Sequence, residues 1–184
     1  NLMNKKQLLV PALLSALVLN GCSPGWYYRA NTVDDDDLVE VSQSAVENLL
    51  ANHRLPRGSL VVINSMVNVD DLGQTLPFGR IMSDQLSSSL HQAGYRVMGM
   101  ELPTEIFAKN DAGILQLPEK TKEALNAVHA HAVLIGTYAP GRENVYVSLR
   151  LVELVSQDVI STFDFSTPLG PDAKALTSRP QAKE

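Results

Sequence analysis

The sequence has little of what would support disulfides, membrane spans or nucleic-acid binding. Its 184 residues include a single cysteine, Cys22, so no internal disulfide can form. The longest largely apolar run covers residues 8–19, which is too short for a spanning helix of about 20 apolar residues. Acidic residues outnumber basic ones, 20 to 15, and the formal net charge is −5. Because no long basic run occurs either, nucleic acid is not an expected partner.

Motifs for common catalytic chemistry are also missing. The sequence has no G-x-S-x-G elbow, no P-loop and no dinucleotide fingerprint. His129 and His131 form an H-x-H pair, but they fall at a predicted helix end and strand start, so we interpret them as polar end residues rather than metal ligands. Asp70 and Asp71 are interpreted as solvent-exposed loop acids. We therefore predict no enzyme activity, no cofactor, no metal site and no small-molecule substrate.

The first residues carry a secretory signal. Lys5 and Lys6 precede the apolar run, and a small residue follows it, which is the three-part plan of a signal peptide. This segment ends in a stretch that resembles a bacterial lipobox, namely Leu19, Asn20, Gly21 and Cys22. In a lipobox, a signal peptidase cuts before the cysteine, whose sulfur then carries a diacylglycerol. We predict that residues 1–21 are a lipoprotein signal peptide and that Cys22 is the lipid-anchored residue.

Residues 22–33 are predicted to be a short lipid-anchored tether. Ser23 stands where an aspartate is expected in a lipoprotein retained at the inner membrane, so resemblance to the sorting rule implies the outer membrane. Three aromatic residues follow, Trp26, Tyr27 and Tyr28. Their rings suit the lipid headgroup region, but they are equally suited to packing on the domain or on a partner. The sequence leaves both alternatives open.

Residues 34–167 predict one α/β domain. It opens with four aspartates, 34–37, which we interpret as the solvated start of a helix because the helix dipole favours acids there. Helices are predicted at 38–50, 76–93 and 118–130. The second is the clearest, since apolar residues recur every fourth position in it, at Phe78, Met82, Leu86 and Leu90. Strands are predicted at 59–66, 95–102, 131–139, 143–154 and 159–165.

The order of these elements predicts the sheet. A strand, a helix and a strand within residues 59–102 favour a parallel crossover, and the closely spaced last strands favour an antiparallel meander. We therefore expect a single mixed sheet of about five strands, packed with about three helices. Residues 168–184 hold three prolines and little periodicity, and they are predicted to be a disordered tail.

Two segments resemble the FlgO family of flagellar outer-membrane lipoproteins. In residues 58–102 the likeness lies in the order of a hydrophobic strand, a "VDDL" loop, "FGR", a long helix and "GYRV". It continues in residues 132–154, where "GTY" precedes a pair of strands. The resemblance implies a non-enzymatic outer-membrane lipoprotein with a periplasmic domain. It also implies basal-body ring proteins as partners, in a ring needed for motility, and it leaves open whether copies of this chain form a homo-oligomer or ring.

An alternative from another class is a periplasmic lipoprotein that activates a cell-wall synthesis or envelope assembly machine. Such a protein is expected to have a long disordered linker after its lipidated cysteine. Here only residues 23–33 separate Cys22 from the acidic helix start, so the domain should stay near the membrane. The short tether disfavours this alternative.

Overall fold

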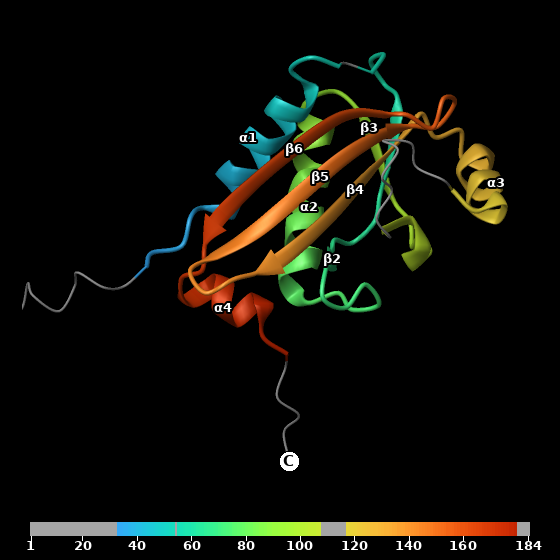
Figure 1. Cartoon of the computed structure of the whole chain (residues 1–184). Coiled ribbons are helices and arrows are strands. Elements are labelled where there is room, and N and C mark those ends of the chain that lie inside the picture. Colours follow the sequence, from blue (N-terminus) through green and yellow to red (C-terminus); the bar gives the residue numbers. More distant parts are fainter. Residues whose placement is uncertain (1–32, 54, 108–116, 180–184) are drawn as a thin grey trace, which may run out of the picture. The chain divides into compact units, whose positions relative to one another are not determined.

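A computed structural model of the chain describes residues 33–53, 55–107 and 117–179. These residues form a mixed six-stranded sheet with the order β3-β1-β4-β5-β6, and β2 adds to the end of β4 (Figure 1). The strands are β1 (Leu60–Ile63), β2 (Val67–Asn68), β3 (Arg96–Gly99), β4 (Ala132–Pro140), β5 (Asn144–Glu153) and β6 (Val159–Pro168). β3, β1 and β4 pair in parallel, whereas β4, β5 and β6 pair antiparallel. The predicted mixed α/β sheet is confirmed.

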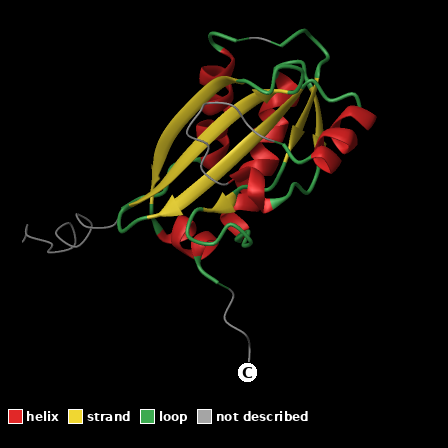
Figure 2. Cartoon of the chain, turned by 45° about the vertical axis from the view of Figure 1, so that its right-hand side comes forward, coloured by secondary structure: helices red, strands yellow, loops and turns green. Residues whose placement is uncertain are grey.

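The helices divide between the two faces of the sheet. They are α1 (Leu38–Leu50), α2 (Pro77–Gln92), the 3-10 helix η2 (Thr104–Phe107), α3 (Glu119–Ala127) and α4 (Pro171–Thr177). α1 and α2 lie together behind the sheet in Figure 1 and bury the larger core, which includes Leu49 and Leu86. η2 and α3 cover the parallel end of the opposite face with Ile106 and Leu125. Among the described residues, no helix covers the outer face of the antiparallel strands in the turned view of Figure 2.

The strands that lie between the two cores carry apolar residues on both faces. In β1, Val61 and Ile63 belong to the core under α1 and α2, whereas Val62 belongs to the core under α3. β5 shows the opposite pattern, because Val145, Val147, Leu149 and Leu151 are buried while Tyr146 and Arg150 are exposed. A strand covered on both sides is continuously apolar, and one with a wet side alternates. This is the pattern that the sequence predicted for each segment.

α2 forms where the sequence predicted it and buries the predicted face. Pro77 occupies its first turn, where a missing backbone N–H costs nothing. Phe78, Met82 and Leu86 are 0% exposed and Leu90 is 1% exposed. Ser88 points to solvent. The helix crosses from β1 to β3, which are hydrogen-bonded neighbours running in the same direction.

Three elements were not predicted, namely β2, η2 and α4. β2 falls inside the segment expected to be a polar loop, and it pairs with only the Thr137–Tyr138 end of β4. The expectation of a disordered tail from residue 168 is wrong for the described part of that segment, since α4 spans Pro171–Thr177. Leu169, which precedes this helix, and Ala173 within it are both buried. A helix of one or two turns shows too little periodicity to be recognised in a sequence. β3 is also shorter than predicted, because the chain leaves the sheet after Gly99 to bury Leu102.

The buried face of α2 predicts unequal costs for substitutions at two positions on opposite sides of the helix. Leu86→Ala should destabilise the domain by about 2–5 kcal/mol, because it removes buried methyl groups and leaves a cavity. Ser88→Ala should change the unfolding free energy by less than about 0.5 kcal/mol, because that side chain is exposed. Urea unfolding of the two variants measures both effects. Equal midpoint shifts would show that the faces of α2 are assigned wrongly.

Candidate functional site

Three of the motifs that define the resemblance, "VDDL", "FGR" and "GTY", lie close together in the fold. The "VDDL" loop follows β2, the glycine of "FGR" is Gly79 in the first turn of α2, and the tyrosine of "GTY" is Tyr138 in β4. Tyr138 is 1% exposed, and its ring lies 5.2 Å from the ring of Phe78. The Leu76 backbone N–H donates a hydrogen bond to the Tyr138 hydroxyl, at 3.1 Å. Tyr138 therefore joins the sheet to the residue that caps α2.

Gly79 is required by close packing at this junction. A Cβ atom there would collide with the Met66 carbonyl oxygen and would lie 2.9 Å from Cε1 of Tyr138. Ser83, one turn further along α2, accepts a hydrogen bond from the Met66 N–H at 2.9 Å. Its hydroxyl donates to the Gly79 carbonyl at 2.8 Å. The first turns of α2 are thus held against the segment that links β1 to β2, and the motif glycine permits this close packing.

Burial raises the pKa of the Tyr138 hydroxyl above its ordinary value of 10.0, although the Leu76 hydrogen bond and the nearby charge of Arg80 lower it. The dominant effect is desolvation, which disfavours the phenolate. Tyr138 is therefore a neutral hydroxyl at physiological pH. In the fold its hydroxyl accepts the hydrogen bond from the Leu76 N–H.

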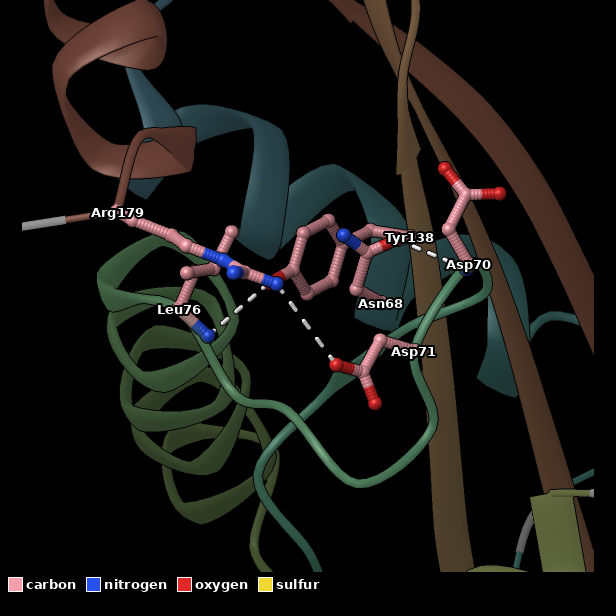
Figure 3. Close-up of polar contacts among 6 residues, drawn as sticks. All are labelled: Asn68, Asp70, Asp71, Leu76, Tyr138 and Arg179. Atoms are coloured by element: carbon pink, nitrogen blue, oxygen red, sulfur yellow. Dashed lines mark hydrogen bonds and ion pairs between the residues drawn. The ribbon is translucent and has the colours of Figure 1, made fainter.

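The two adjacent acids of the loop lie at the surface beside this junction (Figure 3). Asn68 accepts a hydrogen bond from the Asp70 N–H at 3.1 Å, which shapes the turn. Asp71 forms a 4.0 Å ion pair with Arg179, which follows α4. Both partners of the pair are more than half exposed, so it contributes about 0–1 kcal/mol. Both acids are exposed, as the sequence predicted.

The acidic run at 34–37 does more than start a helix in solvent. Asp37 is the N-cap of α1 and accepts a hydrogen bond from the Val39 N–H at 2.9 Å. Asp36 accepts one from the Thr167 hydroxyl at 3.3 Å. Asp35 accepts two from the first turn of α4, from Asp172 N–H at 2.7 Å and Ala173 N–H at 3.0 Å. The interpretation as a helix start holds for Asp37 but misses the long-range contacts of the other two.

We call the contacts of Asp35 and Asp36 with residues 167–173 the terminal clasp. Its geometry depends on Gly170, because a Cβ there would lie 2.6 Å from Oδ1 of Asp35 and 2.7 Å from its backbone nitrogen. The clasp fixes the beginning of the domain to its end. No local signal in the sequence points to it, since Asp35 and Asp172 are 137 positions apart.

The histidines lie at element ends, as interpreted from the sequence. His129 follows the end of α3 with a positive φ of 56°. His131 precedes β4, and its Nδ1 accepts a hydrogen bond from the Leu60 N–H at 3.2 Å. Within the described residues, no three histidine, cysteine or acidic side chains are grouped as metal ligands. The lipobox residues Leu19–Cys22 and the aromatic residues 26–28 lie outside the described part of the chain.

In residues 33–179, apart from the gaps given above, no helix combines the length and the apolar character that a membrane span requires. The described residues form a mixed α/β domain. The residues of the "FGR" and "GTY" motifs join α2 to the sheet, and the acidic run joins the start of the domain to α4.

The chain belongs to the FlgO family. The family model, described as FlgO protein, matches residues 43–172, which is more than half of the chain and extends from within α1 into α4. The resemblance drawn from the sequence motifs is therefore confirmed. No curated protein matches the chain by sequence.

Solved structures show where the fold recurs. The LpoB C-terminal domain from Escherichia coli has 17% identity and a TM-score of 0.51, covering 71% of this chain and 98% of that one. The corresponding domain from Salmonella enterica has 14% identity and a TM-score of 0.53, with the same coverage. At these identities the likeness shows a shared fold alone.

Loss of the Tyr138 hydroxyl should destabilise the junction and alter its response to alkali. Tyr138→Phe leaves the buried Leu76 N–H without its acceptor, which should cost about 1–3 kcal/mol at neutral pH. In the wild type, a folded-state pKa above the unfolded value of about 10 stabilises the fold below that pH, and this contribution is lost as the pH rises further. The difference between the two proteins should therefore shrink above pH 10. Unfolding titrations from pH 7 to 11 measure it, and a constant difference would contradict the assignment.

Breaking the terminal clasp should release α4. Asp35→Ala removes the acceptor of two backbone N–H groups, and such caps contribute about 0.5–2 kcal/mol. Gly170→Ala should produce a similar loss through the steric conflict described above. Hydrogen exchange of the Asp172 and Ala173 amides should accelerate in both variants.

Asp34→Ala is the matched control for this test, because it removes a neighbouring exposed carboxylate. Its unfolding free energy should differ from wild type by less than about 0.5 kcal/mol. Unchanged amide exchange in Asp35→Ala would show that the clasp does not hold α4.

Proposed function

We propose that this protein is a non-enzymatic, outer-membrane lipoprotein of the bacterial flagellum, a member of a ring around the basal body that motility requires. The observation that carries the proposal is the match of the FlgO family model across residues 43–172. The lipobox ending in Cys22 supplies the anchor, and Ser23 directs the lipoprotein to the outer membrane. The domain faces the periplasm.

The dimensions of the tether support this role. Residues 23–33 span about 40 Å at full extension, at roughly 3.3–3.6 Å a residue. Asp35 is already fixed to α4 by the terminal clasp, so the length available to the tether ends before it. A domain held this close to the membrane is suited to a membrane-associated ring and poorly suited to reaching across the periplasm.

The proposed mechanism needs no covalent chemistry. A lipid with several acyl chains provides firm anchoring, because each buried methylene contributes about 0.8 kcal/mol. Anchoring confines the domains to one surface and raises their local concentration for ring contacts. The described side chains then act by shape, charge and strand pairing.

A gene deletion with complementation tests the proposal. The deletion should abolish or weaken swimming in soft agar and reduce basal-body ring density in cryo-tomograms. Wild-type protein should restore both, and Cys22→Ser should not, because it removes the anchor. A fatty-acid probe should label the wild type but not Cys22→Ser.

Asp70→Ala and Asp71→Ala are matched surface controls, and both should restore swimming. A deletion strain with normal swimming and normal rings would refute the flagellar role. If that strain instead became sensitive to cell-wall antibiotics, the alternative role in cell-wall synthesis would replace it. A folded, membrane-bound His131→Ala protein without function would contradict the non-enzymatic assignment.

A further inference from the structure

We propose that copies of this chain assemble head to tail, with the free β6 edge of one copy pairing in parallel with the free β3 edge of the next. The inference deepens the proposed ring role and rests on it. The starting observation is that the sheet ends at β3 on one side and at β6 on the other (Figures 1 and 2). No described strand lies outside either edge. β6 has ten residues and β3 has four.

Unpaired edge strands offer rows of backbone N–H and C=O groups to another chain. Natural edges are commonly protected by lysine, by internal proline or by a bulge. β6 contains no lysine, and its proline is its last residue, Pro168. Its register irregularity lies at the start of the strand, opposite Leu151 and Val152. Most of β6 is therefore a regular edge that is able to accept a strand.

The directions of the two edges suit a head-to-tail contact. β3 and β4 both run parallel to β1, and two antiparallel pairings lead from β4 through β5 to β6. β6 consequently points the same way as β3. Related copies can therefore continue the sheet by parallel pairing, and a repeated contact of this kind closes into a ring where its rotation permits.

The side chains of the two edges match on both faces. Val97 packs toward the core under α1 and α2, as do Phe163 and Phe165. On the opposite face lie the exposed Arg96 and Met98 of β3 and the exposed Thr162 and Asp164 of β6. Met98 pairs with Val62 across β3 and β1. Thr162 pairs with Arg150, which in turn pairs with Ile135. Because Val62 and Ile135 both pack in the core under α3, Met98 and Thr162 lie on that side of the sheet. Continuing the sheet from β6 to β3 of the next copy therefore places the apolar side chain of Val97 on the same side as those of Phe163 and Phe165.

Charge complementarity selects a second copy as the occupant of the β6 edge. Arg96 is exposed on β3, and Asp164 is exposed on the same face of β6. Asp164 already accepts a hydrogen bond from the Ser148 hydroxyl at 2.6 Å, and its carboxylate retains capacity for a cation. Cross-strand pairs of opposite charge stabilise a sheet. Alternation places the two residues on one side of the continued sheet.

A groove between α1 and β6 provides the remaining contact. Its apolar lining consists of Val41, Phe163 and Phe165, and its polar lining consists of Asp36, Asp37, Glu40, Ser44 and Ser166. The two phenylalanine rings are stacked with centroids 5.8 Å apart and are only partly buried. In the proposed pairing, Val97 of the neighbouring copy covers the exposed part of these rings.

Cysteine cross-linking of the full lipidated protein in outer membranes tests the contact. The chain has one native cysteine, the lipidation site Cys22, so introduced thiols report specifically. Thr162→Cys marks β6 and Met98→Cys marks β3 on the same face. A short bismaleimide should give dimers, trimers and higher oligomers of the double variant. Each single variant should stay monomeric, and a mixture of the two singles should give dimers alone.

Charge exchange provides the second arm. Arg96→Glu in the double-cysteine protein should eliminate the ladder, and adding Asp164→Arg should restore it. Dimers of Thr162→Cys alone would overturn the proposal in favour of two-fold β6 pairing. Monomers in every variant, with both thiols reactive to a simple maleimide, would also overturn it. If ladders are absent while swimming and rings depend on the protein, the contact is wrong and the flagellar role stands.

Discussion

The fold depends on the burial of β4 on both of its faces. Ala132, Leu134 and Tyr138 pack under α1 and α2, and Val133 and Ile135 pack under α3. Such a strand can lie only in the middle of a sheet, because each edge of its backbone must also find partners. It takes parallel partners, β1 and β2, on one side and the antiparallel β5 on the other. The change from parallel to antiparallel pairing therefore occurs at this strand.

That position also explains why the family motifs lie where they do. Tyr138 lies near the end of β4, beside the loop that leads into α2. A large ring at this point fills the space between β4 and α2, and its hydroxyl accepts the N–H of Leu76. Gly79 is then needed because the helix approaches the Met66 backbone closely. The tyrosine and the glycine therefore take part in the same packing contact between β4 and α2.

The sequence predicted the elements whose pattern repeats over several turns or residues. The four-residue spacing in α2 and the alternation in β5 each gave strong local signals, and both elements form as expected. β2, with two residues, and α4, with seven, are too short to show a period. The terminal clasp was missed for a different reason. Asp35 makes its bonds to residues far away in the chain, and a run of four aspartates gives no indication of which carboxylate turns inward.

The two free edges raise the question of how such a sheet avoids uncontrolled association. β3 offers only four residues, so a single parallel pairing buries little surface and is weak in dilute solution. Asp164 adds selectivity, because it favours an edge that carries a cation and repels one that carries an acid. Under the proposed function, tethering at the membrane changes the balance, since it raises the effective concentration without adding any contact. Under the proposed arrangement, assembly is therefore weak until the lipid anchor has brought the domains together. The local concentration of the domains at the membrane then determines whether they assemble.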